Sequence, residues 1–310
     1  MKSVSPRKAF QTMLREPGII VQPAIATPFA ARLAEMAGIK ALALGGFAMG
    51  ASTALTEPLL SLDEVAEITR QITEITDLPL MVDAGAGWGE AIHVQRTVRR
   101  LEQAGATSIH IEDQFYPKRA SYHKGIEEII PAEEMVEKVY AAVEARTDPE
   151  FVLVVRTDAM RSHGYDEAIR RAKLYLDAGA DMIKCFPRND EEAQRVPKDL
   201  PGVPLVYVTS PGNRRGWAVL TAPQAEAYGY KVIYDSIATT IATALGLRHY
   251  FESVVRDGSN GFEGDTTAIR DYFEKAMGLD RLYEIELKIS ERILRQQGKS
   301  HADQKADAVR

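Results

Sequence analysis

The chain has 310 residues, of which 45% are hydrophobic and 26% charged, an ordinary composition for a globular protein with one large domain or two small ones. Its net charge of −6 disfavours nucleic acid or an anionic membrane as the main partner. The single cysteine, Cys185, excludes an intrachain disulfide. No stretch approaches the roughly 18 apolar residues of a membrane span, and the first residues lack the apolar core of a secretory signal. We therefore expect a soluble, cytoplasmic protein.

Eight short stretches rich in β-branched and other apolar residues alternate with helical patterns along the chain. Several are almost continuously apolar, which is typical of parallel strands covered on both faces. The predicted strands span residues 19–25, 41–46, 78–85, 108–113, 151–159, 181–186, 203–209 and 231–236.

Segments between these strands have the spacing and the end signals of amphipathic helices. Ser61 and Glu64 have the spacing of a capping box at the start of the first of them. Gly105 and Gly179 are typical residues at helix ends. The clearest predicted helices span residues 61–76, 91–105, 131–146 and 165–179.

Strands that alternate with helices in this way predict a (β/α)8 barrel, here over residues 1–250. The alternative is an open, doubly wound sheet, but the first predicted strand is not followed by the Gly-rich phosphate turn of that fold. Residues 251–310 are mostly helical in pattern and exceed what closing a barrel requires. We expect this extension to pack on the barrel or on a neighbouring subunit.

Function in such a barrel lies at the C-terminal ends of the strands, where charged residues gather in this sequence. Asp83 and Glu112 end the third and fourth predicted strands, Lys118 follows the fourth, and Arg156 lies in the fifth. Carboxylates without cysteine suit a hard cation such as Mg2+ or Mn2+. Lys118 and Arg156 suit an acidic group of a substrate. Together they predict a site in which the metal stabilises an enolate and the cations hold the acid groups.

Several of these residues also have a purely structural explanation. A carboxylate at a strand end is often a helix cap or one half of an ion pair. An arginine inside an apolar strand needs an anionic partner, and for Arg156 that partner can be Glu112 instead of a substrate. His110, on the same side of its strand as Glu112, can equally be a core histidine with satisfied hydrogen bonds. Cys185 is expected only to pack near a strand end.

Three phrases resemble the isocitrate lyase and phosphoenolpyruvate mutase superfamily: HIEDQFYPKR at 110–119, MVDAGAGWG at 81–89 and LVVRTDA at 153–159. The resemblance extends from about residue 18 to about residue 250. It implies a (β/α)8 barrel that binds Mg2+ and makes or breaks C–C or P–C bonds beside a pyruvate-like enolate. It also implies a homotetramer, a dimer of dimers, in which subunits exchange a C-terminal helix.

The resemblance assigns roles position by position. Asp83 matches the direct metal ligand of the superfamily, and Glu112 matches a ligand that acts through water. Residues 114–125 match the loop that closes over the substrate. The expected catalytic residues are Arg156, Lys118, His110, Ser121 and His123, and the expected substrate-binding residues are Gly45, Gly46, Phe47, Gln114 and Arg156.

The sequence departs from the superfamily at several positions. The catalytic acid of the lyases is the cysteine of K-R-C-G-H, and Ala120 stands there in this chain, which leaves Ser121, Tyr122 or His123 to supply the proton. The Glu and Asn that complete many family sites are not found near the phrases KCFPR and YVTSPG. Other family positions, three of them acidic and one a serine, fall on Gly85, Thr56, Thr27 and Leu44.

Three functions remain open. The first is a Mg2+-dependent C–C lyase or decarboxylase that acts on a small 2-hydroxy or 2-oxo dicarboxylic acid. The second is a P–C bond enzyme of the phosphonopyruvate mutase or hydrolase type, which ranks lower because KRASYHKG lacks the Asn-Ser pair of those relatives. The third is a non-catalytic, ligand-binding member, suggested by the lost acidic positions and opposed by the retained Asp83, Glu112 and Arg156.

Overall fold

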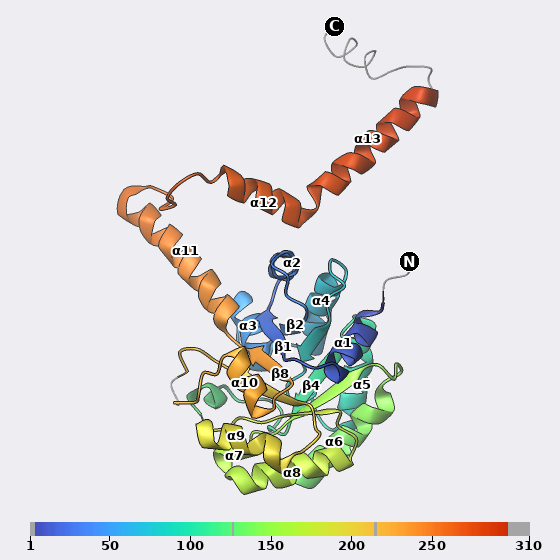
Figure 1. The fold of residues 1–310 in the computed structure, drawn as a ribbon, viewed down its shortest axis with the longest axis vertical. Helices are drawn as coiled ribbons and strands as arrows, with labels where there is room; N and C mark the ends of the chain where they lie inside the picture. Colours follow the sequence, from blue (N-terminus) through green and yellow to red (C-terminus); the bar gives the residue numbers. More distant parts are fainter. Residues whose placement is uncertain (1–3, 126, 214–215, 297–310) are drawn as a thin grey trace. The chain divides into compact units, whose positions relative to one another are not determined.

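The computed structural model describes residues 4–125, 127–213 and 216–296. Eight parallel strands close into a barrel in sequence order, with β8 pairing back to β1 (Figure 1). The predicted (β/α)8 fold and all eight predicted strands are therefore confirmed. The strands are β1 (Ile20–Ile25), β2 (Leu42–Leu44), β3 (Leu80–Asp83), β4 (Ser108–Glu112), β5 (Val152–Arg156), β6 (Met182–Lys184), β7 (Leu205–Thr209) and β8 (Val232–Asp235).

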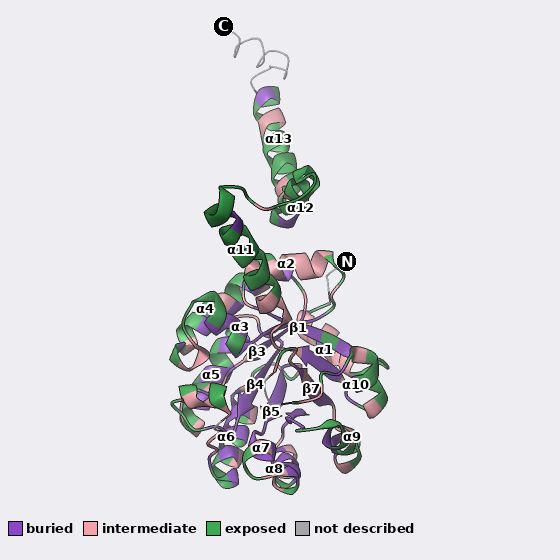
Figure 2. Ribbon diagram, turned by 90° about the vertical axis from the view of Figure 1, so that its left-hand side faces the viewer, coloured by how far each residue is buried: buried purple, intermediate pink, exposed green. Residues whose placement is uncertain are grey.

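Helices surround the strands, and burial falls from the strands to the outer helix faces (Figure 2). The four predicted helices form as α4 (Leu62–Thr73), α5 (Ala91–Gln103), α6 (Ala132–Ala145) and α8 (Tyr165–Asp177). The capping box of α4 is present, because Ser61 N donates to Glu64 Oε2 at 2.8 Å and Ser61 Oγ accepts from Glu64 N. Gly105 and Gly179 follow α5 and α8 with φ of 92° and 105°, a backbone conformation that favours glycine.

Shorter helices were not predicted from the sequence. The first, α1 (Pro6–Arg15), buries Phe10 completely in a cluster with Ile20, Met182 and Val206, and so covers an end of the barrel interior. The other unpredicted helices are α2 (Pro28–Met36), α3 (Gly46–Ser52), α7 (Ala159–Ser162), α9 (Asp190–Asp199) and α10 (Ala222–Tyr228). Glycines in α3 and an internal proline in α9 are unfavourable in helices, so the sequence pattern does not predict these two elements.

The chain divides into two compact units between Arg248 and His249. The predicted boundary at residue 250 lies inside α11 (Ala238–Asp257), the helix that spans this division. The second unit also contains α12 (Thr267–Met277) and α13 (Leu279–Gln296). Many of their apolar side chains are exposed within the single chain, among them Ile269, Tyr272, Phe273, Leu282, Ile285, Ile289 and Ile293. None of the helices in the described ranges is long and apolar enough to cross a membrane.

Candidate active site

The register of the barrel sheet brings the charged strand ends into one row. Asp83 on β3 pairs with His110 on β4. Glu112 at the end of β4 pairs with Arg156 on β5, and Arg156 pairs in turn with Lys184 on β6. All five residues therefore lie at the C-terminal end of the barrel, where (β/α)8 enzymes carry their chemistry.

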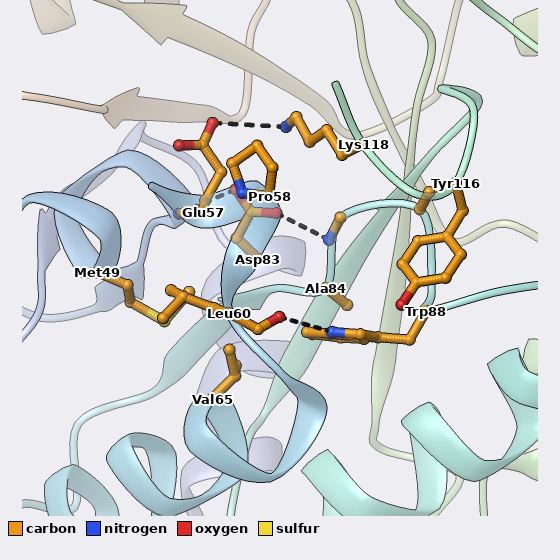
Figure 3. Close-up of a pocket in the computed structure, with 13 residues that line it drawn as sticks. Met49, Glu57, Pro58, Leu60, Val65, Asp83, Ala84, Trp88, Tyr116 and Lys118 are labelled. Carbon is orange, nitrogen blue, oxygen red and sulfur yellow. Dashed lines mark hydrogen bonds and ion pairs between the residues drawn. The ribbon is translucent and has the colours of Figure 1, made fainter. Parts of the chain in front are cut away.

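Two cavities open at this end of the barrel, and both are lined by Glu57, Asp83 and Lys118. The larger, which we call the main cavity, has a volume of about 250 Å³. In the smaller cavity, Lys118 and Glu57 face each other above Asp83, with their charged groups 3.7 Å apart (Figure 3). The further charged residues that line the main cavity are His123, Arg156, Arg161 and Lys184.

Glu112 is fully buried and holds two of the cavity cations from behind. Its Oε1 lies 2.9 Å from Lys118 Nζ, and its Oε2 lies 2.9 Å from Arg156 Nη1. Arg156 also donates from Nε and Nη2 to the two oxygens of buried Asp158, at 3.0 and 2.9 Å. Arg156 thus has the anionic partner within the protein that a purely structural explanation requires. Its side chain nevertheless also lines the main cavity.

Asp83 joins the backbone loops that follow β2 and β3. Its Oδ2 accepts from Gly46 N at 3.0 Å, and its Oδ1 accepts from Gly85 N at 2.9 Å. A Cβ at Gly46 would lie 2.8 Å from Asp83 Oδ2, so this approach requires glycine. Burial by itself would raise the pKa of Asp83, but the nearby His110, Lys118 and Lys184 outweigh burial and lower that pKa.

Lys184 is a cavity residue that was not predicted from the sequence. It is 1% exposed, and its Nζ lies 3.3 Å from His110 Nε2 and 4.2 Å from the centre of the Tyr234 ring. Burial, together with the charge of Arg156, lowers the pKa of Lys184 to about 7. The signal was present in DMIKCF, because a lysine inside an apolar strand needs a reason just as Arg156 does.

His110 is buried behind Lys184 and is not among the described residues that line either cavity. Its Nε2 lies 3.6 Å from Asp83 Oδ2 and 3.3 Å from Lys184 Nζ. Burial lowers the pKa of His110 well below its ordinary value, so the imidazole is neutral at pH 7. The predicted catalytic histidine thus reaches the main cavity through Lys184 and Asp83, which both line it.

The loop after β4 places two of its three candidate proton donors at the main cavity. Tyr122 and His123 line it, and Ser121 is not among the described lining residues. The Tyr122 hydroxyl accepts from Arg156 Nη2 at 3.1 Å, and its ring lies 4.2 Å from Lys118 Nζ. His123 Nε2 lies 2.8 Å from Thr56 Oγ1 and 3.3 Å from Glu57 Oε2.

The predicted substrate-binding residues do not all line the main cavity. Phe47 lines the main cavity and Gly46 lines the smaller one, whereas Gly45 lies beneath the Tyr234 hydroxyl. Gln114 is buried and donates to Asp158 Oδ2 at 2.9 Å, which makes it a support for the Arg156 pair. The cavity wall also contains Arg161, stacked on Trp217, and Phe186. Arg161 and Phe186 were not predicted as site residues.

Comparison with known proteins identifies the family. The chain matches the family described as phosphoenolpyruvate phosphomutase over residues 10–255. The chain belongs to this family. It is 37% identical over 283 residues to a probable 2-methylisocitrate lyase of Corynebacterium glutamicum. The matched region covers 90% of this chain and 87% of the relative. The superfamily resemblance seen in the three sequence phrases is thereby confirmed.

Two solved structures of the superfamily fold bear on the chemistry. Oxaloacetate acetylhydrolase in complex with the inhibitor 3,3-difluorooxalacetate superposes with a TM-score of 0.85 at 26% identity, over 96% of this chain and 98% of the other. Phosphonopyruvate hydrolase in complex with oxalate and Mg2+ superposes with a TM-score of 0.77 at 28% identity, over 92% of this chain and 99% of the other.

The resemblance implies a Mg2+ held directly by Asp83 and through water by Glu112, and several features of this chain surround that predicted site. Among residues 4–125, 127–213 and 216–296, no three His, Cys, Asp or Glu side chains are grouped to hold a metal ion. Both oxygens of Glu112 are held by Lys118 and Arg156. Gly85 stands where the superfamily has a second carboxylate, and Lys184 brings an amine into the same cavity. A Mg2+ ion that keeps several waters needs only one or two carboxylates, so Asp83 and Glu112 remain its predicted ligands.

Proposed function

We propose that this chain is a lyase or decarboxylase that cleaves a C–C bond of a small 2-oxo or 2-hydroxy dicarboxylic acid. The observation that carries the proposal is the arrangement of charge at the main cavity. Lys118 and Arg156 face the cavity, while their shared partner Glu112 is fully buried behind them. The wall therefore offers positive groups to an acid, and a volume of about 250 Å³ suits a molecule of a few carbon atoms.

Arg156 and Arg161 are the groups best suited to hold the carboxylates of such a substrate. A guanidinium presents a planar fork that matches a carboxylate, and both side chains line the main cavity. Asp158 orients Arg156 through two hydrogen bonds, and Glu127 pairs with Arg161 at 3.0 Å. These buried partners fix the two forks before any substrate arrives, which reduces the entropy lost on binding.

Tyr122 is the proton donor that we assign in place of the missing cysteine at Ala120. Its hydroxyl lies at the main cavity, 3.1 Å from Arg156 Nη2. It thus stands beside a group assigned to hold the substrate. The loop of residues 114–125 carries it, so closure of this loop would bring donor and substrate together.

The names of two relatives agree with a dicarboxylic acid as substrate. A 2,3-dimethylmalate lyase is 33% identical to this chain, and oxaloacetate acetylhydrolase is solved with a fluorinated oxaloacetate. The proposal is tested by incubating the purified protein with oxaloacetate, 2-methylisocitrate, 2,3-dimethylmalate and phosphonopyruvate, and by measuring oxo-acid release. Turnover of oxaloacetate, 2-methylisocitrate or 2,3-dimethylmalate supports the proposal. Turnover of phosphonopyruvate alone would establish P–C chemistry instead, and oxalate binding without any turnover would establish a binding protein.

The assembly and location of the protein belong to the same proposal. We expect a homotetramer, a dimer of dimers in which C-terminal helices are exchanged between subunits. The exposed apolar residues of α12 and α13 support a partner for these helices. Cytoplasmic location stays a prediction from the sequence.

A further inference from the structure

Lys184 differs from the other cations of the main cavity in having no carboxylate partner. Lys118 lies 2.9 Å from Glu112, Arg156 lies 2.9 Å from Asp158, and Arg161 lies 3.0 Å from Glu127. Among the residues that the structure describes, no carboxylate forms an ion pair with Lys184. Its hydrogen-bond partner is the neutral ring of His110. A buried amine without a counter-ion is expensive unless it loses its charge or serves a ligand.

We propose that Lys184 is a catalytic nucleophile, whose amine forms an imine with the C2 carbonyl of a 2-oxo acid bound in the main cavity. The proposal rests on the proposed function, and it narrows both the mechanism and the substrate class. In this mechanism the protonated imine takes up the electrons of the C–C bond that breaks.

The geometry around Lys184 suits this role. Lys184 lines the main cavity at the end of β6, next to Arg156 on β5, a group assigned to hold a carboxylate. The rings of Tyr234 and Phe186 lie 4.2 and 5.9 Å from Nζ, and they keep the amine out of water. Imine formation needs an uncharged amine, which burial and a neighbouring cation both favour. The pKa of Lys184, lowered to about 7, agrees with this.

His110 and Asp83 form a path for protons behind the amine. Lys184 Nζ, His110 Nε2 and Asp83 Oδ2 follow one another at 3.3 and 3.6 Å. Forming an imine requires protons to move to and from the nitrogen and the departing oxygen. An imidazole in contact with the amine is placed to relay such a proton.

An imine also accounts for which family features this chain lacks and which it retains. In a metal-dependent site the ion takes the charge that develops on the substrate oxygen. Here Gly85 and Thr56 stand at acidic family positions, while the cations Lys118 and Arg156 remain. A protonated imine on Lys184 places a positive charge on the nitrogen attached to C2, and so performs the same electronic task without those carboxylates.

The steps balance for a 2-oxo acid that carries a carboxylate on C3. The lysine amine adds to C2, and the resulting carbinolamine loses water to give the protonated imine. The bond between C3 and the carboxylate breaks, CO2 leaves, and the electron pair moves to the nitrogen to give an enamine. Tyr122 protonates C3, and water then hydrolyses the imine, which releases the 2-oxo acid and the free amine. A 3-(hydroxyalkyl) group in place of the carboxylate would leave as an aldehyde or ketone once its hydroxyl is deprotonated.

This mechanism restricts the substrate to acids that already have a 2-oxo group. A 2-hydroxy acid has no carbonyl at C2 for the amine to attack. Of the two substrate classes in the proposed function, the imine mechanism therefore requires 2-oxo acids. The bond that breaks joins C3 to its carboxylate or hydroxyalkyl group. Oxaloacetate is the simplest probe with these features.

Borohydride trapping tests the proposal. The full-length protein is incubated with oxaloacetate or pyruvate, sodium borohydride is added, and the modified peptide is mapped by mass spectrometry. We expect one reduced pyruvyl adduct, located on Lys184, and irreversible loss of activity in proportion to the adduct. Lys184→Arg keeps the charge but cannot form an imine, and we expect it to give no adduct. Lys118→Arg is the matched lysine control and should retain the adduct.

The outcomes separate this proposal from the proposed function. CO2 release from oxaloacetate that is unaffected by EDTA, with trapping at Lys184, supports both. Turnover without any adduct, turnover with the adduct on another lysine, or turnover abolished by EDTA overturns the imine and leaves the lyase function intact. An adduct on Lys184 without turnover of any 2-oxo or 2-hydroxy acid supports the imine and overturns the lyase function. Neither adduct nor turnover overturns both.

Discussion

Nζ of Lys184 lies 3.3 Å from Nε2 of His110, although the two residues stand on β6 and β4 with β5 between them. The contact is possible because both side chains point toward the barrel axis. Both groups are almost completely buried, and burial lowers the pKa of each. Two basic groups in contact cannot both be charged at modest cost, so a substantial fraction of the Lys184 amine is uncharged near pH 7.

Activity should depend on pH through Lys184. The amine must be uncharged to attack, and its pKa is lowered to about 7, so we expect kcat/KM for a 2-oxo acid to rise with pH through about 7 and then level off. Initial rates from about pH 6 to about pH 9 test this. Arg156, Asp83 and Asp158 also act on the amine. The pKa of Arg156 is raised and the pKa values of Asp83 and Asp158 are lowered, so none of these three groups should titrate in this range. A flat profile for the wild type would contradict the assignment.

The free energy of unfolding should also depend on pH through Lys184, and the sign of this dependence follows from its pKa. The folded pKa of Lys184 is about 7 and the ordinary value is 10.5, so between these values the unfolded chain binds more protons. The free energy of unfolding should therefore rise with pH across this window, by at most about 1.4 kcal/mol per pH unit from this group. Lys184→Met removes this contribution. Urea unfolding at several pH values should show that the stability of the variant relative to wild type falls as pH increases from about 7 to about 10.

Arg156 should be important for folding as well as for binding. Arg156→Met leaves Glu112 and Asp158, both fully buried, without their shared cation. Breaking a buried ion pair in this way typically costs about 3–5 kcal/mol. The matched control is Arg70→Met, because the ion pairs of Arg70 with Glu67 and Glu74 are exposed to solvent and should contribute little to stability. If urea unfolding gave equal losses of unfolding free energy in the two variants, the buried ion pairs of Arg156 would not stabilise the fold more than the exposed pairs of Arg70.

The barrel was predictable because its signals are local. Apolar stretches and helix ends repeat along the chain, and each strand pairs with its neighbours in sequence order. The same rule that singled out Arg156, a charge inside an apolar strand, applies equally to Lys184 in DMIKCF. The three superfamily phrases cover only β3, β4 and β5, so the resemblance assigns no role to Lys184 on β6.

Side-chain direction in the site was not predictable. Gln114 lies two positions after Glu112 in the HIEDQ phrase, yet it turns away from the cavities to hold Asp158. Ser121, Tyr122 and His123 were equivalent candidates in the sequence. The short 3-10 helix Ala120–Lys124 turns Tyr122 and His123 toward the main cavity, and its rotation depends on contacts with residues as distant as Thr56.

The exposed side of α13 should determine the size of the assembly. Leu282, Ile285, Ile289 and Ile293 recur at helical spacing and are 41–54% exposed in the single chain. We expect Ile285→Asp with Ile289→Asp to reduce the molar mass in analytical ultracentrifugation from that of a tetramer. Glu291→Lys changes charge on the opposite side of the helix and should leave the mass unchanged. A wild-type monomer would contradict the proposed assembly outright.

Tyr122→Phe should separate chemistry from folding. The substitution removes the hydroxyl that accepts from Arg156 Nη2 but keeps the ring beside Lys118. Loss of a proton donor typically costs about 10²-fold or more in kcat, whereas KM should change little because Arg156 and Arg161 still hold the acid groups. Tyr140→Phe, at an exposed position on α6, is the control for removing a tyrosine hydroxyl. In the trapping experiment Tyr122→Phe should still form the adduct on Lys184, since Tyr122 acts only after the C–C bond has broken. A variant that lost both turnover and adduct would instead assign Tyr122 to substrate binding.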